Sequence, residues 1–386
     1  MKNVRYGIVG LGNMGSQHFK FIKGGQIEGA VIGAVCDINP ERLKWARENY
    51  EGELPCYENY SDMLKSGKID AVIIAVPHYL HPVIGMEAID LGIATLSEKP
   101  IGVYTKIITE WNEQAKKSGV PFGIMYNQRT NPVYIKMREI VKSGQLGELK
   151  RSVWIITNWY RPQAYYDSGT WRATWAGEGG GVLINQCPHN LDLWQWICGM
   201  PSSVRAFMSF GKYHDIEVED DVTIYAKYAC GATGLFITTT GEAPGTNRFE
   251  VSGSKGKIVY DGKLRYWKLG CDERVFNKEN KVPFAAPPCE YEEFDLGPSP
   301  EHRGILRNFT NHVLYGEELI APGVEGINGL SISNAAHLSE WTGNSEIELP
   351  NDGEAFLREL KKRIKTSRAK PEYSTAPVDI SDTYNT

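Results

Sequence analysis

The chain has 386 residues, which at roughly 150 residues per domain suggests two or three domains. Hydrophobic residues make up 41% and charged residues 23%, values typical of globular proteins that argue against a disordered or fibrous chain. The net charge of −5 disfavours nucleic acid as a partner, and no apolar run approaches the ~20 residues that cross a membrane.

The seven cysteines form no CxxC pair, so neither a zinc framework nor a disulfide scaffold is expected. The eight histidines show no HxxxH spacing, and we expect no metal site. Residues 4–10 already have the pattern of a strand, with no apolar signal segment before them. These features predict a reducing, cytoplasmic location.

The first third of the chain alternates short apolar runs with amphipathic stretches. This alternation is typical of a parallel sheet buried on both faces, whose strands are joined by right-handed crossover helices. We therefore predict a doubly wound α/β sheet. Its strands are expected at Tyr6–Val9, Val31–Cys36, Ala71–Val76, Ala94–Ser97 and Pro121–Met125, and its helices at Met14–Lys23, Pro40–Tyr50, Tyr60–Ser66, His81–Leu91 and Lys106–Ser118.

After about Gly147 the pattern changes to strands joined by turns, interrupted only by a helical stretch at Cys187–Cys198. This change predicts an α+β domain with a large, mostly antiparallel open sheet. We expect a dinucleotide-binding domain over residues 1–125, a second domain over 126–366 and a polar tail over 367–386. The C-terminal helices of the second domain are expected to pack back on both domains. The later strands are expected at Leu149–Tyr160, Val204–Phe210, Val222–Tyr228, Thr233–Thr240, Arg248–Val251, Gly256–Tyr260 and Lys263–Trp267, and the later helices at His302–Leu314, Val324–Glu340 and Gly353–Lys365.

A GxGxxG motif, Gly10-Leu11-Gly12-Asn13-Met14-Gly15, directly follows the first predicted strand. Gly10 permits a tight turn, Gly12 lets the backbone approach a pyrophosphate, and Gly15 lets the next helix pack closely on the strand. The N-terminus of that helix offers N–H groups to an anion. The alternative interpretation is a glycine-rich turn without a ligand.

Asp37, followed by Ile38, ends the second predicted strand about 20 residues after the glycines, where dinucleotide-binding folds place an acidic residue. A carboxylate there accepts hydrogen bonds from ribose hydroxyls and repels a 2′-phosphate, which favours NAD over NADP. Arg42 complicates this preference. The alternative for Asp37 is a helix cap before Asn39-Pro40.

The tripeptide Glu98-Lys99-Pro100 follows the fourth predicted strand, at the sheet edge where open α/β folds bind ligands. A partly desolvated lysine can exchange a proton near neutral pH, and Glu98 could position it or contact the cofactor. A solvated lysine with a surface glutamate is the alternative.

A glycine run, Gly177-Glu178-Gly179-Gly180-Gly181, leads to Pro188, which suits the first turn of a helix. His189 and Asp192 are an i, i+3 pair on that helix, so a carboxylate is available to orient an imidazole acting as general base. The alternatives are a structural histidine at a domain interface and a glycine run that only permits a bend.

These motifs occur in the order glycine turn, Glu98-Lys99-Pro100, Gly179-Gly180-Gly181 and His189-Asn190-Leu191-Asp192. With them the chain resembles the Gfo/Idh/MocA family of oxidoreductases, over nearly its whole length. The resemblance implies a Rossmann domain followed by an open-sheet domain that often serves homo-oligomer contacts. It also implies NAD(P) bound at Gly10–Gly15 and Asp37.

The resemblance assigns further residues to the site. Many polyol-oxidising members carry Asp where Asn185 stands, and because an amide cannot accept a proton, we expect Asn185 to bind the substrate. Asn127 and Tyr160 are further substrate-binding candidates. The remaining assignments are Pro77, His78 and His81 in a loop that covers the cofactor, Glu98 and Lys99 as cofactor contacts, Trp171 and Arg172 at the nicotinamide side, and catalytic roles for Lys99 and His189.

We therefore expect NAD-dependent oxidation of a secondary hydroxyl of a small carbohydrate, at ring carbon C3 of a sugar or glycoside. The aromatic residues crowded between Trp154 and Trp175 suit a sugar ring, with core packing or a subunit interface as the alternative. Two other functions stay open. One is a redox-neutral glycoside-cleaving or epimerising enzyme that retains NAD, and the other is a non-catalytic NAD-binding regulator.

Overall fold

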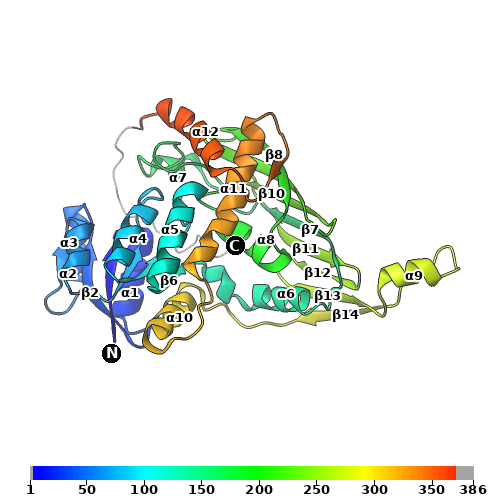
Figure 1. Ribbon diagram of the computed structural model, residues 1–386, viewed down its shortest axis with the longest axis horizontal. Helices are drawn as coiled ribbons and strands as arrows, with labels where there is room; N and C mark the ends of the chain where they lie inside the picture. The colour runs from blue at the N-terminus through cyan, green and yellow to red at the C-terminus, as the bar shows by residue number, and fades with distance from the viewer. Residues whose placement is uncertain (1–2, 371–386) are drawn as a thin grey trace.

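The computed structural model describes residues 3–370 and contains two sheets (Figure 1). The first sheet has six parallel strands in the order β3-β2-β1-β4-β5-β6, which is the doubly wound arrangement predicted for this part of the chain. The two-residue strand β3 was not predicted, because it is too short to form an apolar run. The strands are β1 (Val4–Val9), β2 (Ala30–Cys36), β3 (Cys56–Tyr57), β4 (Ala71–Ile74), β5 (Ala94–Ser97) and β6 (Phe122–Ile124).

Both faces of this sheet are buried. Alternate residues of β4 enter different clusters: Ile73 packs in the cluster of Phe19 from α1, whereas Val72 packs in the cluster of Met63 from α3. Because successive side chains of a strand point to opposite faces, helices must cover both sides. These helices are α1 (Asn13–Lys23), α2 (Pro40–Glu48), α3 (Tyr60–Lys65), α4 (Leu80–Asp90) and α5 (Thr105–Ser118).

The second sheet has nine strands in the order β14-β13-β12-β11-β7-β10-β9-β8-β15. Its neighbours pair antiparallel except β7 and β10, which are parallel, so the predicted mostly antiparallel sheet is confirmed. The strands are β7 (Leu149–Ile156), β8 (Ser203–Phe210), β9 (Glu219–Lys227), β10 (Thr233–Thr239), β11 (Asn247–Gly253), β12 (Gly256–Tyr260), β13 (Leu264–Leu269), β14 (Cys289–Phe294) and β15 (Ile347–Glu348).

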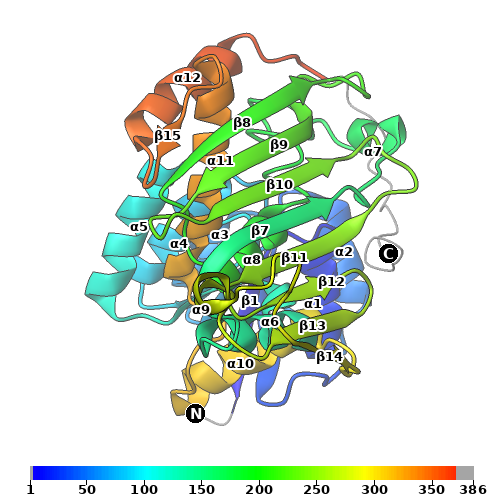
Figure 2. The ribbon, with the colours of Figure 1, turned by 90° about the vertical axis from the view of Figure 1, so that its right-hand side faces the viewer.

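One face of the second sheet is covered and the other is open, as Figure 2 shows. The covered face packs against α6 (Pro132–Lys142), α8 (Pro188–Cys198) and α11 (Gly326–Trp341). Helix α11 also contacts α5 and α12 (Gly353–Lys365), while α10 (Glu301–Tyr315) packs beside β1. The C-terminal helices therefore bridge the two sheets, and the intervening space is where the predicted site residues meet.

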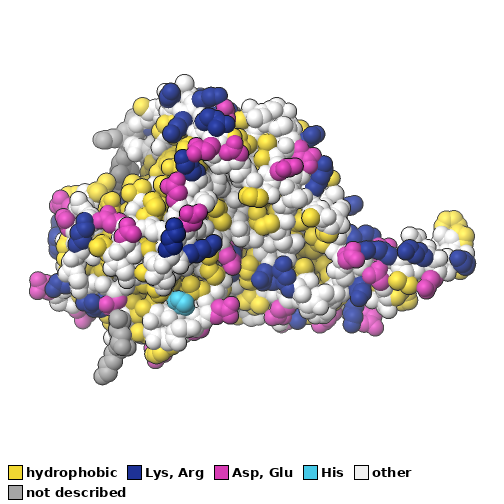
Figure 3. All heavy atoms as spheres, viewed as in Figure 1, with side chains coloured by type: hydrophobic (Ala, Val, Ile, Leu, Met, Phe, Trp, Pro, Cys, Tyr) yellow, Lys and Arg dark blue, Asp and Glu magenta, His cyan; other side chains and the backbone are white. Residues whose placement is uncertain are grey.

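Several elements differ from the expectation. The strands of the second sheet are interrupted not only by α8 but also by α7 (Gln163–Asp167) and α9 (Glu273–Glu279). Helix α9 buries none of its residues, so it has no apolar stripe to reveal it in the sequence. It lies on an arm at the right of Figures 1 and 3, close to exposed Val282 and Phe284.

The polar tail predicted over 367–386 falls mostly outside the described residues, but its first residues are placed. The Ser367 hydroxyl and the Arg368 N–H both donate hydrogen bonds to the Glu217 carboxylate. The η1 turn (Asn127–Thr130) follows β6 directly, next to the predicted domain boundary. Within residues 3–370, no helix is both long and apolar enough to span a membrane.

Candidate active site

The glycine turn has the geometry of an anion site. Gly10 has φ +88°, and a Cβ at Gly15 would lie 1.7 Å from the Gly10 carbonyl oxygen, so neither position accepts a side chain. At Gly12, by contrast, the nearest atom to such a Cβ is Arg42 Nη1 at 3.8 Å, so space is open there. Helix α1 begins at Asn13 with no side-chain cap and no acidic residue in its first turn. This cradle fits a pyrophosphate.

Asp37 supports this turn from the end of β2. Its Oδ2 accepts the Leu11 N–H at 2.7 Å, and its Oδ1 accepts the Asn39 N–H at 2.8 Å. Asp37 is not the helix cap that the sequence left open, because the Asn39 side chain caps α2. Arg42 Nη1 lies 3.4 Å from Asp37 Oδ2, and Ile38 is exposed. A carboxylate has more acceptor sites than these contacts use, which leaves room for ribose hydroxyls.

The loop after β4 lies between the glycine turn and the glycine run. His78, which follows Pro77, is buried, lies edge-on to Trp171 at 5.5 Å between ring centroids, and places Nδ1 3.3 Å from the Glu178 carbonyl oxygen. Both ring nitrogens of His81 lie 2.7 Å from backbone carbonyl oxygens, those of Pro100 and Val76. His81 therefore ties this loop to the turn after β5, and its ring nitrogens are already occupied.

Lys99 emerges from the carboxyl end of β5 and reaches across to the glycine-rich segment. Its Nζ donates a 2.9 Å hydrogen bond to the Asn185 carbonyl oxygen. Burial lowers the pKa of Lys99 below its usual 10.5, and the charges of Glu98 and Glu178 offset part of this effect. A lysine in this setting is more acidic than one in water, as proton exchange near neutral pH requires.

The charge of Glu98 acts on Lys99, but its carboxylate makes its side-chain hydrogen bond elsewhere. Its Oε1 lies 2.6 Å from His18 Nε2, a buried pair that links β5 to α1. Burial alone would raise the pKa of Glu98, but the hydrogen bond from His18 and the charges of neighbouring groups lower it to about 2. Glu98 is thus ionised at neutral pH and helps to hold the two elements that flank the cradle.

His189 stands on the first turn of α8 and is buried. Neither ring nitrogen has a hydrogen-bond partner within residues 3–370. Burial, together with the charges of Lys99 and His302, holds the pKa of His189 well below 6.5, so the ring is neutral at pH 7. A neutral, unpartnered imidazole beside a lysine is able to accept a proton from a ligand.

Asp192 does not orient His189, which corrects the i, i+3 pairing that the sequence suggested. Its two carboxylate oxygens accept hydrogen bonds from Arg129 Nη2 at 2.7 Å and Nε at 2.8 Å. Both side chains are almost fully buried. The charge of Arg129, 63 residues away in the chain, attracts this carboxylate more strongly than a neutral imidazole does. The pair instead fixes α8 to η1.

Asn127 belongs to η1 and lies at the same end of the site. Its Nδ2 is 3.4 Å from His302 Nδ1, while its Oδ1, also buried, has no partner in the described part of the chain. Burial lowers the pKa of His302 to about 4, so this ring is also neutral at pH 7. An amide oxygen in this position is available to accept a hydrogen bond from a ligand hydroxyl.

Asn185 is held by side chains from two segments. Its Oδ1 accepts the Tyr165 hydroxyl at 3.2 Å, and its Nδ2 donates to Glu178 Oε1. Arg172 Nη1 in turn donates to the Tyr165 oxygen at 2.9 Å, and its guanidinium stacks 4.6 Å from the centres of the Tyr165 and Trp171 rings. Lys99, Asn185 and Arg172 are therefore joined in one network.

The aromatic segment, residues 154–175, divides into two groups. Trp154 is fully buried and stacks on Phe249 at 4.2 Å, and Trp175 is buried against Trp341, so these two rings are core. Trp159 is half-buried and donates Nε1–H to Asn190 Oδ1 at 3.3 Å, next to His189, while Tyr160 is 49% exposed. The half-buried group, with Tyr165 and Trp171, is available to a ligand.

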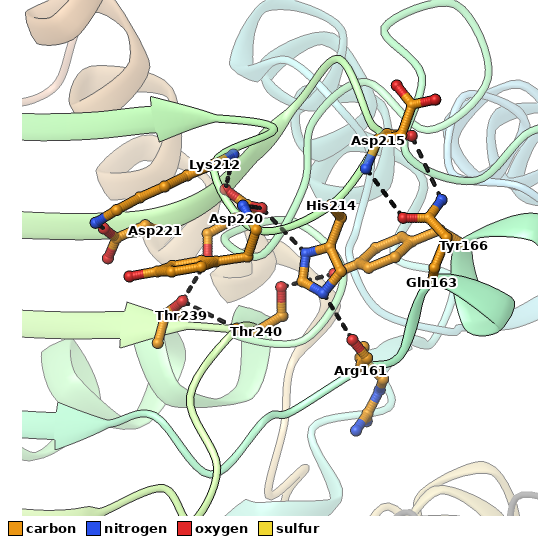
Figure 4. Close-up of polar contacts among 12 residues, drawn as sticks. Arg161, Gln163, Tyr166, Lys212, His214, Asp215, Asp220, Asp221, Thr239 and Thr240 are labelled. Carbon is orange, nitrogen blue, oxygen red and sulfur yellow. Dashed lines mark hydrogen bonds and ion pairs between the residues drawn. The ribbon is translucent and has the colours of Figure 1, made fainter.

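His214 anchors this segment from the hairpin between β8 and β9, as Figure 4 shows. His214 Nδ1 is 3.0 Å from Asp220 Oδ2, and its Nε2 is 2.7 Å from the Arg161 carbonyl oxygen. The ring also packs 4.8 Å from that of Tyr166. Asp220 lies on β9 and Arg161 lies in the aromatic segment, so His214 joins residues 161–166 to the second sheet.

The sequence did not assign roles to Tyr165, Glu178, His214 or His302. The only local signal was for Glu178, the one charged residue in the glycine run. Because a glutamate is almost never fully buried without a partner, a buried Glu178 would indicate partners nearby. The other three come from distant segments and carry no motif. Across residues 3–370, no group of three His, Cys, Asp or Glu side chains is placed to bind a metal ion.

Two family models match the chain. One, described as "Oxidoreductase family, NAD-binding Rossmann fold", matches residues 4–126, and the other, "GFO/IDH/MocA C-terminal domain", matches residues 134–259. The NAD-binding domain agrees with the cradle at Gly12 and with the predicted cofactor.

Individual relatives are distant in sequence. Myo-inositol 2-dehydrogenase of Thermotoga maritima is 24% identical over 87% of this chain and 96% of its own length. Inositol 2-dehydrogenase of Corynebacterium glutamicum is 32% identical, but over only 38% of this chain and 44% of its own length. The crystal structure of the WlbA dehydrogenase from Bordetella pertussis, in complex with NADH and UDP-GlcNAcA, superposes with TM-score 0.75 and 26% identity, over 91% of this chain and 100% of that one. The chain belongs to the GFO/IDH/MocA family and is an oxidoreductase with an NAD-binding Rossmann domain.

Proposed function

We propose that the protein oxidises a secondary hydroxyl of a sugar or glycoside, at ring carbon C3, with NAD as the acceptor of the hydride. The observation that carries this proposal is the buried His189, whose two ring nitrogens lack partners in the described chain and whose neighbour is Lys99. Relatives described as acting on inositol, and a solved neighbour holding a nucleotide sugar, support the substrate class.

Each group of residues has its own task in this proposal. Neutral His189 takes the proton of the substrate hydroxyl, and the Lys99 ammonium stabilises the charge that develops on that oxygen. Asn185 and Asn127 hydrogen-bond neighbouring hydroxyls, and Tyr160 with the half-buried rings packs on the sugar. The residues of the glycine turn, Asp37, His78, Trp171 and Arg172 would hold NAD, whose nicotinamide C4 accepts the hydride.

A substrate panel tests the proposal. The purified chain is mixed with NAD and single sugars, glycosides or polyols, and NADH absorbance is followed while the product is identified by NMR. We expect NADH with at least one sugar or glycoside, and a 3-keto product. NAD binding without turnover of any panel member contradicts the proposal. Unchanged redox level of a converted glycoside, with NAD retained by the protein, identifies the redox-neutral alternative instead.

The proposal also includes a cytoplasmic homo-oligomer. All seven cysteines are free thiols, and Cys36 and Cys187 are buried, which suits a reducing compartment. The open face of the second sheet, turned toward the viewer in Figure 2, carries exposed apolar side chains such as Phe207 and Tyr225 and so suits contact with another copy of the chain.

A further inference from the structure

Glu178 is a buried acid within the glycine run. Its side chain is 2% exposed, yet it lies in a segment of five residues that otherwise consists of glycine. Burying a carboxylate is costly unless hydrogen bonds satisfy it. The contacts of Glu178 therefore show what the buried charge does.

Both carboxylate oxygens of Glu178 accept hydrogen bonds from uncharged donors. Oε2 accepts the Ala173 N–H at 2.6 Å, and Oε1 accepts from Asn185 Nδ2. Burial raises the pKa of Glu178, while the charge of Arg172 and the hydrogen bonds from Ala173 and Asn185 favour the ionised form. As a carboxylate Glu178 only accepts, so the Asn185 amide turns its NH₂ group toward Glu178 and its oxygen toward the Tyr165 hydroxyl. Glu178 thus determines the orientation of the Asn185 amide.

The charge of the same carboxylate acts on the ammonium of Lys99, which is hydrogen-bonded to the backbone carbonyl oxygen of Asn185, the residue whose side chain Glu178 holds. Burial lowers the pKa of Lys99, and the charges of two carboxylates, Glu98 and Glu178, oppose this effect. Glu98 is already paired with His18, whereas Glu178 has no hydrogen bond from a cation in the described chain. The other charged or titratable groups that act on Lys99 or Glu178 are Arg161, Arg172, Glu219, His78, His81, His189, His302, Lys370, Tyr166 and Cys187.

We propose that Glu178 is a positioning carboxylate of the active site, which orients the Asn185 amide toward the substrate and supplies a negative charge beside Lys99. This role rests on the proposed function, because it concerns the same site. It differs from a purely structural role in two respects. It predicts an effect on the protonation of Lys99, and it predicts that the donor and acceptor roles of residues 178 and 185 are interchangeable.

The double variant E178Q/N185D tests the second point. In E178Q, the new amide can satisfy Ala173 or Asn185 but not both, because it has one acceptor where two are needed. In N185D, two carboxylates face each other. In the double variant, the amide oxygen at position 178 accepts from Ala173 while its NH₂ donates to the carboxylate at position 185, and one negative charge remains near Lys99. We expect each single variant to lower kcat at least about tenfold, and the double variant to recover most of that loss.

The ionisation of Lys99 tests the first point without turnover. Acetylation of Lys99 by acetic anhydride is measured across pH by peptide mass spectrometry on the NAD-loaded protein. Because a negative charge favours the ammonium, E178Q should move the midpoint of Lys99 labelling to lower pH, and E178Q/N185D should move it back. E217Q is the matched control. Like Glu178, Glu217 accepts a backbone N–H of the segment before the glycine run, that of Trp175 at 2.6 Å, but it has no hydrogen bond with Asn185. We expect this control to leave the midpoint unchanged.

A double variant no better than the worse single variant, or an unmoved Lys99 midpoint in E178Q, would overturn the proposal. The labelling measurement needs no substrate. If no sugar or glycoside is oxidised but the midpoint moves as expected, the proposed function fails while the role of Glu178 beside Lys99 stands.

Discussion

At the scale of single residues, burial decides which side chain carries a proton at neutral pH. His189 is neutral because its surroundings penalise the imidazolium, and Lys99, although its pKa is lowered, starts from a much higher value. The two groups therefore stand in opposite states over the neutral range. A hydroxyl between them meets one base and one cation, which is the combination that hydroxyl oxidation requires.

The pH dependence of oxidation follows from this pair. Activity requires neutral His189, so kcat/KM should fall only as pH drops below 6.5, and it requires charged Lys99, so it should also fall as pH rises toward 10.5. In H189Q we expect kcat to drop by about 10²- to 10⁴-fold and the acid limb to disappear. A pH series of initial rates measures both. An unchanged acid limb in H189Q would assign that proton to another group.

At the scale of elements, the site depends on how the aromatic segment is held against the second sheet. The Arg161 N–H bonds the Thr240 carbonyl oxygen, and His214, on the β8–β9 hairpin, adds a contact with the Arg161 carbonyl oxygen. Asp220, the second partner of His214, is itself fixed by the N–H groups of Lys212 and Tyr213. The anchor is therefore rigid on the sheet side and acts on Tyr165 through the segment.

Removal of the His214 side chain should weaken substrate binding more than it slows the chemical step. In H214A the contacts with Asp220 and with the Arg161 carbonyl oxygen are lost, so we expect KM for the sugar to rise by about tenfold, with a smaller change in kcat. H312A is a matched control, because His312 also bonds a carbonyl oxygen, that of Glu317, but on α10. Steady-state kinetics of both variants provide the measurement. Equal KM values in H214A and the wild type would show that the segment is held by other contacts.

At the scale of the whole molecule, the question is whether the open face of the second sheet meets solvent or another copy of the chain. Phe207 and Tyr225 are exposed on it, and they continue into Leu235 and Ile237 across the ladder. The opposite side chains of the same strands are fully buried beneath α8, as Phe236 illustrates. Because side chains alternate between faces, these apolar side chains share the open face, where polar residues such as Arg205 and Thr223 lie between them.

A charge on this face should disrupt the assembly. We expect the wild type to sediment as a homo-oligomer, and F207D to shift toward the monomer while its far-UV circular dichroism stays unchanged. V275D is the control, since Val275 is similarly exposed but lies on α9, away from the face. Analytical ultracentrifugation of the three proteins gives the masses. A monomeric wild type would contradict the proposed assembly.

The sequence by itself determined the Rossmann half. Buried parallel strands are short and apolar, and the positive φ of Gly10 and the contact of Gly15 with Gly10 act between residues close in the chain, so local patterns are sufficient to predict them. The second sheet was predicted as mostly antiparallel, but α6, α7, α9 and the edge strands β14 and β15 were missed. Helix α6 buries Tyr134, Met137 and Ile140, so its apolar spacing was present in the sequence and was overlooked. The others bury little and therefore leave little periodicity.

Only the tertiary structure decided the partners within the site. Sequence proximity suggested that Asp192 serves His189, but the folded chain brings Arg129 to Asp192 and leaves the imidazole without a hydrogen bond from the described residues. The contact of Lys99 with Asn185 spans 86 residues and that of His214 with Arg161 spans 53. Local motifs identify the chemical groups of a site, whereas the partners of buried charges are set by long-range packing, since each buried charge pairs with whatever the fold places beside it.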